Sequence, residues 1–417
     1  MMNKQGWNYV PINDVAEVNK SSLKNSTPKD LEFDYIDIAS ITRTGVIENA
    51  KKLTFGEAPS RARRIVHIGD TIISTVRPYL KAFAFINKDY DRQVCSTGFA
   101  VLTPKETKVD PKYLYQTILS DKFVEYTKSK MTGSNYPAIN AGDVKDYRIY
   151  LPPLQEQKKI AEILSSVDEA IERTEEIIEQ TEKIKKGLMQ QLLTKGIGHT
   201  KFKKTVLGMT PEGWEVAALK SIARKVTDGT HQSPKFTEEG IPFLLVSNIV
   251  KGFINWETEK FISNETYLEL TKNRQVEKGD ILYSAVGSYG VAVVVDIERG
   301  FSFQRHIAWV KPLVEKVDSH YLAYVLNSGI GKKQADSVAV GNAQKTITLD
   351  SLSKFLIPLP SLTEQKEIVD VLWSFDKKLR IENRKLLSLK MIKQGLMQSL
   401  LTGKVRVKVD KNEVGQV

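Results

Sequence analysis

The chain has few of the features that mark secreted or membrane proteins. Cys95 is the only cysteine in 417 residues, which excludes an internal disulfide framework and is typical of a reducing compartment. No segment approaches about 18 consecutive apolar residues, the length a membrane span needs. The N-terminal segment has no apolar core of signal-peptide length. We therefore expect a cytoplasmic protein without a membrane-spanning segment.

Motifs for catalysis and cofactor binding are also missing. The sequence contains no GxxxxGK[ST] loop, no GxGxxG and no NPPY-type tetrapeptide of an amino-methyltransferase. The five histidines and Cys95 show no metal-ligand spacing. The segment ETEK at 257–260 is reminiscent of a nuclease centre, but such triplets are common by chance in a chain with 111 charged residues. We expect no catalytic residue, no metal and no cofactor bound by this chain, and a recognition subunit is more plausible than an enzyme.

Basic residues outnumber acidic ones, and their distribution is uneven. The net charge is +11 and the pI is about 9.3, which favours a polyanionic partner because Lys and Arg neutralise phosphates. Residues 1–150 carry a net charge of +5, whereas residues 209–358 are neutral. The neutral segment argues against a purely electrostatic binder.

The strongest signal is an internal repeat. Residues 151–194 and 359–402 are identical at 19 of 44 positions with a constant offset of 208. That period is far longer than the roughly 20–50 residues of a solenoid unit. Matching segments continue upstream, among them GDTIISTV at 69–76 with GDILYSAV at 279–286, and FAVLTP at 99–104 with IAWVKP at 307–312. The sequence predicts a tandem duplication with domains at 1–150 and 205–358, each followed by a helix, at 151–198 and 359–404.

The globular modules have the composition of mixed α/β domains. Short apolar stretches between Gly, Pro, Asn and Asp predict strands and turns, and residues 113–129 and 321–329 predict helices. We expect a barrel-like or curved sheet with attached helices. The predicted fold class is α+β.

Both repeated segments predict long amphipathic helices, the first over about residues 155–193. Alternating steps of three and four residues place apolar side chains on one narrow stripe, the seam of a coiled coil. The core of this stripe is Ile160, Leu164, Val167, Ile171 and Ile178 in the first helix and Ile368, Leu372, Phe375, Leu379 and Leu386 in the second, with Ile184, Leu188, Leu192, Ile392, Leu396 and Leu400 beyond them. We expect the two helices to pair as an antiparallel coiled coil that spaces the domains. The alternative is that each helix packs onto its own domain.

Several loops carry side chains suited to DNA. Arg, Lys, Asn and Gln present the donors and acceptors that base edges require, and cations contact phosphates. The candidates in the first module are Arg61, Arg63, Arg64, Arg77, Tyr79, Lys81, Ser134, Asn135 and Tyr136. Those in the second are Thr230, His231, Gln232, Lys235, Ser288, Tyr289, Arg305, His306, Asn342, Gln344 and Lys345. The equivalent loops GSNYPAI and GNAQKTI differ between their shared Gly and Ile, which would give different half-sites, although surface drift after duplication would produce the same pattern.

These repeats resemble the specificity (S) subunit of type I restriction-modification systems. The resemblance is carried by LPPLQEQKKI at 151–160 and LPSLTEQKEI at 359–368, and by GLMQQLLT at 187–194 and GLMQSLLT at 395–402. It implies two target recognition domains on double-stranded DNA, each contacting one half of a split sequence, with helix length fixing the spacer. It also implies two methyltransferase (M) subunits that bind S-adenosylmethionine, and restriction (R) subunits that use ATP and Mg²⁺. The S subunit itself is non-catalytic.

Two other hypotheses remain open at this point. The chain could be a bivalent scaffold whose modules grip protein partners, without DNA specificity. It could also be an enzyme with an unrecognised centre, such as a standalone nuclease. A bipartite DNA motif enriched by the chain would separate the DNA reader from both.

Overall fold

The computed structural model describes residues 6–48, 50–87, 93–272, 274–341 and 344–409. The chain divides into two compact units: unit 1 contains Met1–Glu176 and Arg384–Val417, and unit 2 contains Ile177–Asn383. The division falls inside both long helices, so each unit holds one globular part and about half of each helix. Among the described residues, no helix combines the length and apolar composition required to cross a membrane.

Unit 1 is built around two four-stranded sheets. One has the order β2-β11-β8-β9 and the other β6-β3-β10-β7, with β3 and β10 parallel. Two further pairs, β1-β12 and β4-β5, lie beside them. The strands are β1 Asn8–Pro11, β2 Ala16–Val18, β3 Glu32–Ile36, β4 Ile41–Arg43, β5 Val46–Ile47, β6 Lys51–Thr54, β7 Ala62–Val66, β8 Thr71–Ser74, β9 Phe83–Phe85, β10 Gln93–Ser96, β11 Phe99–Pro104 and β12 Arg148–Leu151. The helices are α1 Ile12–Val15, η1 Ile38–Ser40, η2 Pro78–Leu80, α2 Pro111–Leu119, α3 Asp121–Lys130, α4 Ala141–Asp146 and the start of α5 Leu154–Lys195.

Unit 2 repeats this plan. The sheet β16-β22-β19-β20 corresponds to β2-β11-β8-β9, β15-β23 to β1-β12, and the parallel pair β17-β21 to β3-β10. Its strands are β13 Phe202–Thr205, β14 Gly208–Pro211, β15 Glu215–Ala218, β16 Ala223–Asp228, β17 Ile241–Leu244, β18 Phe261–Ile262, β19 Ile281–Ser284, β20 Ala292–Val294, β21 Ser302–Phe303, β22 Ile307–Pro312 and β23 Leu356–Leu359. Its helices are α6 Leu219–Ile222, η3 Val246–Asn248, α7 Asn264–Thr271, α8 Ser319–Asn327, α9 Gly329–Val338, α10 Leu349–Ser353 and the start of α11 Leu362–Leu400. The predicted duplication and α+β class are confirmed, with the strands divided among separate sheets.

The segments 113–129 and 321–329, which were predicted as helices, each lie where two successive helices meet: α2 and α3 in unit 1, and α8 and α9 in unit 2. Ser120 caps α3 by accepting a hydrogen bond from Phe123 N, and Ser328 caps α9 by accepting from Ile330 N. A serine in extended conformation satisfies a free amide at the next helix start, so the chain turns at this residue. The prediction of one continuous helix over 113–129 was therefore wrong, because that segment contains a helix boundary.

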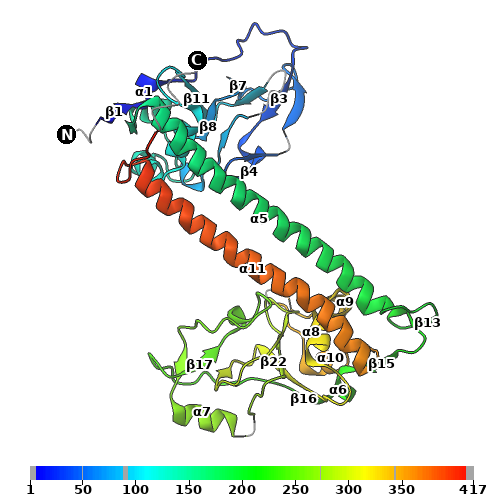
Figure 1. The fold of residues 1–417 in the computed structure, drawn as a ribbon. Helices are drawn as coiled ribbons and strands as arrows, with labels where there is room; N and C mark the ends of the chain where they lie inside the picture. The colour runs from blue at the N-terminus through cyan, green and yellow to red at the C-terminus, as the bar shows by residue number, and fades with distance from the viewer. Residues whose placement is uncertain (1–5, 49, 88–92, 273, 342–343, 410–417) are drawn as a thin grey trace. The chain divides into compact units, whose positions relative to one another are not determined.

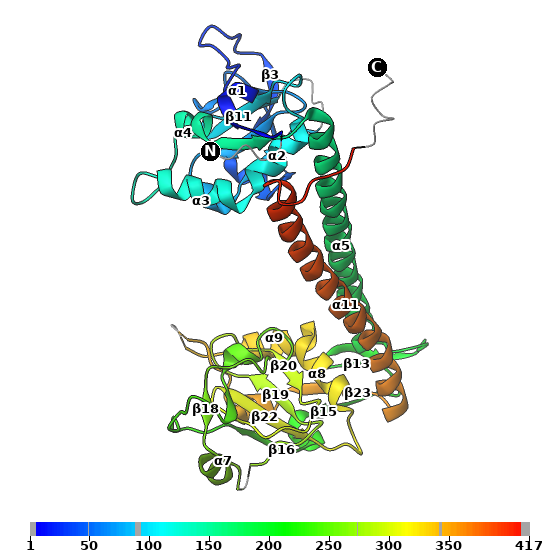
Figure 2. The same ribbon diagram turned by 60° about the vertical axis from the view of Figure 1, so that its left-hand side comes forward.

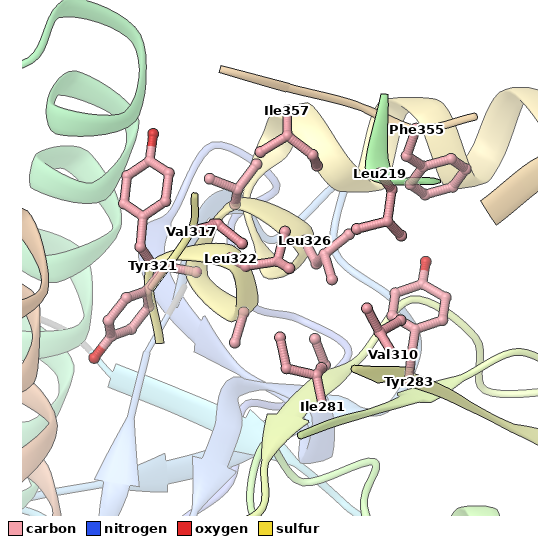
Figure 3. Close-up of a cluster of buried hydrophobic side chains, with 14 of the residues drawn as sticks. Leu219, Ile281, Tyr283, Val310, Val317, Tyr321, Leu322, Leu326, Phe355 and Ile357 are labelled. Atoms are coloured by element: carbon pink, nitrogen blue, oxygen red, sulfur yellow. The ribbon is translucent and has the colours of Figure 1, made fainter. Parts of the chain in front are cut away.

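The core of unit 2 lies between its main sheet and α8 (Figure 3). Ile281 and Tyr283 from β19 and Val310 from β22 face Tyr321 and Leu322 of α8, and all five side chains are fully buried. Apolar side chains on one stripe of α8 must be buried against a partner, and the sheet supplies it. This core fixes the base of the loops that leave β19 and β22.

The two long helices pair in antiparallel orientation, as predicted. In unit 1 the start of α5 lies beside the end of α11, where Lys393 Nζ is 2.6 Å from Asp168 and Lys390 Nζ is 2.8 Å from Glu175. In unit 2 the end of α5 lies beside the start of α11, where Lys185 is paired with Asp376. Figures 1 and 2 show α5 and α11 side by side in both views. Ile160 and Leu164 also pack into the core of their own globular part, so the predicted alternative contact is present as well.

The seam follows a strict three-four spacing that includes polar residues. All of its members are buried or half-buried: Ile160, Leu164, Val167, Ile171, Thr174, Ile178, Thr181, Lys185, Leu188 and Leu192 in α5, and Ile368, Leu372, Phe375, Leu379, Glu382, Leu386, Leu389, Lys393, Leu396 and Leu400 in α11. Ile184 is 56% exposed and Ile392 is 52% exposed. Their predicted place in the stripe was wrong, because the heptad passes through Lys185 and Lys393 instead.

The repeated Glu-Gln sequence ties the start of each long helix to its globular part. Gln157 Nε2 donates to Pro152 O at 2.8 Å and to Lys108 O at 3.1 Å, and its Oε1 accepts from Asp110 N at 2.9 Å. Gln365 makes the same three bonds with Pro360, Lys316 and Asp318. The side-chain amide of each glutamine is buried, and both its nitrogen and its oxygen are hydrogen-bonded. Rotation of the helix would break these bonds and leave buried polar groups unsatisfied, so the bonds fix the orientation of the helix.

The neighbouring glutamates bind a tryptophan and a returning segment of chain. Glu156 is 3% exposed; it accepts from Trp7 Nε1 at 3.1 Å and from Arg406 Nε and Nη2 at 2.8 and 2.7 Å. In unit 2 Glu364 accepts from Trp214 Nε1 at 2.9 Å and lies 2.8 Å from His199 Nε2. The segment after each long helix thus folds back onto the start of the other helix within the same unit.

Candidate nucleic-acid interface

In unit 1 the structure brings two of the predicted loops together. Val76, just after β8, forms a bridge with Ala138, and Arg77 N donates to Pro137 O at 2.8 Å. The guanidinium of Arg77 donates to Asn135 O at 3.0 Å and lies over the Tyr136 ring, 5.1 Å from its centroid. Tyr136 is 72% exposed. The pair therefore presents a cation stacked on an aromatic ring at the surface.

Unit 2 has an equivalent pair of loops with different side chains. Val286 forms a bridge with Thr346, and Gly287 N donates to Lys345 O at 2.9 Å. Gln344 and Lys345 are exposed, and the Gln344 side chain lies against Gly287. Ser288 is exposed in the same turn. The predicted residue Asn342 lies outside the described residues.

Two cations in unit 1 occupy a backbone conformation that unit 2 gives to glycine. Arg77 and Lys81, which flank η2, have φ values of 48° and 52°, and the equivalent Gly287 and Gly290 have φ values of 74° and 94°. A non-glycine residue in the left-handed region costs about 1–2 kcal/mol. Observed strain of this kind is grounds for a functional hypothesis. Arg77 and Lys81 are therefore stronger candidates than the other predicted cations.

The other predicted residues of unit 1 lie on segments near this loop pair, and backbone hydrogen bonds connect some of these segments to β8. Thr97 N donates to Arg61 O, and Thr75 N donates to Gly98 O, so the turn at 97–98 joins the start of β7 to the end of β8. Arg61 is exposed, Arg63 stacks on Phe55 at 4.6 Å, and Arg64 lies within 3.5 Å of Ser22. Ser134 is exposed on the loop that carries Tyr136, and Tyr79 is exposed on η2. Lys81 Nζ instead donates to Leu119 O and Asp121, both at 3.1 Å.

In unit 2 backbone hydrogen bonds between neighbouring loops likewise bring the predicted residues close together. Arg305 N donates to Thr230 O at 3.0 Å, Ala285 N to His306 O at 2.9 Å, and Ile347 N to Ala285 O at 2.8 Å. Residues 230–232, 305–306 and 344–345 therefore lie around the ends of β19 and β22. His231, Gln232, Lys235 and Arg305 are exposed.

Carboxylates modify the electrostatics of unit 2. His231 Nε2 lies 2.9 Å from Asp228, and Tyr289 OH donates to Asp336 at 2.8 Å. The hydrogen bond to Asp336 raises the pKa of Tyr289, which therefore stays neutral as a donor. These two carboxylates add negative charge beside the predicted residues His231 and Tyr289.

Within the described residues, no group of three or more His, Cys, Asp or Glu side chains is arranged to hold a metal ion. The carboxylates at 257–260 lie in the loop before β18, where Lys260 stacks on Phe236 at 4.8 Å.

Comparison with known proteins identifies the family. A sequence model of the type I restriction modification DNA specificity domain matches residues 4–183 and 211–391. The chain therefore belongs to the type I restriction-modification DNA specificity family, and it carries the domain twice. The resemblance predicted from the repeated motifs is confirmed.

Relatives of similar length support this placement. The chain is 33% identical over 322 residues to the type I restriction enzyme MjaVIII specificity subunit of Methanocaldococcus jannaschii, covering 76% of this chain and 75% of the relative. It is 30% identical over 424 residues to the putative type I restriction enzyme MjaX specificity subunit of the same organism, covering 97% and 95%. A solved structure from work on complex assembly and conformational transition of the type I R-M system matches with a TM-score of 0.55 and 26% identity, covering 96% of this chain and 99% of that one. The chain functions as a non-catalytic DNA specificity subunit.

Proposed function

We propose that the two units read the two halves of a bipartite, asymmetric double-stranded DNA target through their loop pairs. The observation that carries this proposal is the equivalence of the loops in position together with their difference in chemistry. Unit 1 offers Arg77 stacked on Tyr136, and unit 2 offers Gln344 beside Gly287. Arginine pairs best with guanine and glutamine with adenine in the major groove. The two half-sites therefore differ in sequence.

The surrounding cations would contact phosphates and set the register of each unit on the duplex. Arg61, Arg305 and Lys345 are exposed beside the loop pairs, where they add affinity without base discrimination. Binding of this kind weakens steeply with salt because each neutralised phosphate releases counterions. A strong salt dependence is therefore part of the proposal.

We further propose that the chain assembles with two methyltransferase subunits and with restriction subunits. Helix α11 exposes large apolar side chains that soluble helices seldom leave to water: Val371, Trp373, Ile381, Leu387, Met391 and Ile392. Large exposed apolar side chains of this kind are typical of a protein–protein contact. S-adenosylmethionine on the methyltransferase subunits, and ATP with Mg²⁺ on the restriction subunits, would supply the chemistry that this chain lacks.

Selection from a randomised duplex library tests the proposal. The chain bound to its methyltransferase subunit should enrich one split motif. Arg77→Ala should relax positions in one half only, and Gln344→Ala positions in the other half only, each by about 1–3 kcal/mol. Lys112→Ala is the matched control, because Lys112 is an exposed lysine on α2 that belongs to neither loop pair; it should leave the motif unchanged.

Three results would contradict this function. Absence of any enriched motif, with capture of protein partners only, would support the bivalent scaffold. A motif in which both substitutions relax the same positions would refute the assignment of one half-site to each unit. Cleavage or methylation by the isolated chain would indicate an enzyme.

A further inference from the structure

Unit 1 contains a cavity outside the Arg77–Tyr136 loop pair, with Lys81 on its wall. Its volume is about 560 Å³, within the roughly 300–1,000 Å³ range of small-ligand sites. One wall is formed by β1, β12 and the junction between α2 and α3, and the other by the end of α11, from Lys390 onward, and the residues after it. All lining residues belong to unit 1.

The charges around this cavity have one dominant sign. The lining holds six cationic side chains and one carboxylate, Asp121; the cations are Lys81, Lys122, Arg148, Lys390, Lys393 and Lys404. Three of the six are ion-paired, with Asp121, Glu175 and Asp168. Among the described residues, no ion pair joins Lys122, Arg148 or Lys404 to a carboxylate. Three cations therefore have no carboxylate partner among the residues that the structure describes.

The same walls supply flat and apolar surfaces. The rings of Tyr9 and Tyr150 lie 4.8 Å apart, with Arg148 over Tyr9 at 5.1 Å and Lys122 over Tyr150 at 5.9 Å. Apolar side chains complete the lining: Leu119, Ile149, Met397 and Leu401. Cations that alternate with aromatic faces are the pattern that holds bases and phosphates together. The cavity is therefore suited to a ligand with both an anionic and a planar part.

Comparison of the two units indicates that this charge is not needed for the fold. The equivalents of Lys122, Arg148 and Lys390 in unit 2 are Ile330, Leu356 and Glu182, although the helices and strands that carry them are the same. Lys81 lies on the cavity wall in the strained left-handed conformation that unit 2 gives to Gly290. Unit 1 thus keeps cations here where the shared framework accepts neutral, acidic or less strained residues.

We propose that this cavity binds a nucleoside diphosphate or triphosphate. Several negative charges on few atoms are required to match three cations around a space of this size. The terminal phosphate of such a nucleotide contributes about −1.5 to −2, and every inner phosphate adds a further negative charge. The base would lie against Tyr9, Tyr150 and the apolar floor. An acidic peptide would carry its charges on separate side chains and could not bring them to one point as a phosphate chain does.

Binding of ADP and ATP to the full-length chain, measured by isothermal titration calorimetry without Mg²⁺, tests the proposal. ADP should bind with one-to-one stoichiometry, and tripolyphosphate and adenosine should each bind more weakly than ADP. The double variant Lys122→Glu, Lys404→Glu should weaken ADP binding by at least about tenfold, because two attractive charges become repulsive. Lys112→Glu, which reverses an exposed lysine outside the cavity, should leave it unchanged. Both variants must show the wild-type circular dichroism spectrum; otherwise Lys122→Ala, Lys404→Ala replaces the first.

Absence of saturable ADP binding, or equal binding by the double variant, would overturn the proposal. So would stronger binding of a glutamate-rich peptide than of ADP. A target-length DNA duplex serves as the final competitor. If DNA displaces ADP one for one and the double variant loses affinity for DNA as well, the cavity belongs to the DNA path, and the proposal of a nucleotide site is overturned. DNA affinity that survives the double substitution while ADP binding is lost would place the nucleotide in a site of its own.

Discussion

The buried glutamate at the start of α5 gives the sharpest test of how unit 1 is held together. Glu156→Leu removes the acceptor of three donors: Trp7 Nε1, the guanidinium of Arg406, and Val407 N, which lies at 3.2 Å. The indole of Trp7 and the amide of Val407 are at least partly buried, so each would cost about 1–3 kcal/mol when left unsatisfied. The Arg406 side chain is 40% exposed and can rehydrate, so loss of its ion pair adds only about 0–1 kcal/mol.

The expected destabilisation of unit 1 is therefore about 2–7 kcal/mol for Glu156→Leu. Glu156→Gln keeps one acceptor and should cost less. The control is Glu162→Gln, because Glu162 is exposed and pairs only with Lys159 on the surface. Since Trp7 is the sole tryptophan of unit 1, urea unfolding followed by ¹⁹F NMR of fluorotryptophan-labelled protein reports on this unit through one resonance.

The pH dependence supplies an independent check with a defined sign. Burial raises the pKa of Glu156, but the hydrogen bonds from Arg406 and Trp7 outweigh burial and leave the pKa below its ordinary value of 4.5. A carboxylate whose pKa is lower in the folded state than in the unfolded state stabilises the fold at pH values above the unfolded-state pKa. This stabilisation is lost as the pH falls through the folded-state pKa. The stability difference between wild type and Glu156→Gln should therefore shrink as the pH falls below the ordinary glutamate pKa of 4.5. A difference that stays constant, or a Glu156→Leu cost no larger than that of Glu162→Gln, would refute the reasoning.

Three further predictions follow from the helix pair and the loops. Leu164→Asp and Leu372→Asp each place a carboxyl group at a fully buried seam position and should destabilise their own units by about 3–5 kcal/mol, seen in the corresponding ¹⁹F resonances; unchanged unfolding of both would refute the seam. Tyr324→Phe removes the 2.6 Å bond to Asp376 and should cost unit 2 about 1 kcal/mol in urea unfolding; no change would show that the bond contributes nothing net. Lys345→Ala should weaken binding to all DNA sequences alike and reduce the slope of log K against log salt by about 0.9; a change in sequence preference would mean that Lys345 reads a base.

The sequence predicted the seam well where it is apolar and failed where it is polar. Ile160 to Ile178 follow the expected steps, but the next two positions are Thr181 and Lys185. The hydroxyl of Thr181 donates to Ile177 O at 2.6 Å and Lys185 pairs with Asp376, so both side chains are satisfied within the seam. A search for apolar residues therefore moves to Ile184, on the exposed side. Strict counting by heptads would have found the correct positions.

The sequence identified the loop segments of the candidate interface, but it could not predict which of these loops contact one another. Turn composition pointed to the segments around Arg77 and Asn135, and the repeat showed that equivalents exist near Gly287 and Gln344. Their contact depends on the sheet order, in which β8 lies between β11 and β9, and strand order is set by long-range pairing that local patterns do not encode. The positive φ angle of Arg77 was likewise beyond sequence reasoning, although its alignment with a glycine is a usable signal.

The chain topology predicts an order of folding. Unit 2 is one continuous segment, whereas unit 1 joins residues 1–176 to 384–417 and closes with contacts such as Arg406 to Glu156, 250 residues apart. Closing so long a loop costs entropy that no local contact repays. Folding of unit 2 pairs Lys185 of α5 with Asp376 of α11. This contact brings together the two chain segments that leave unit 2 and shortens the loop that unit 1 must close. Leu372→Asp should therefore slow the appearance of the native Trp7 resonance during refolding, whereas Leu164→Asp should leave the refolding rate of the unit 2 tryptophans unchanged. Refolding of Trp7 at the wild-type rate in Leu372→Asp would show that unit 1 closes without help from unit 2.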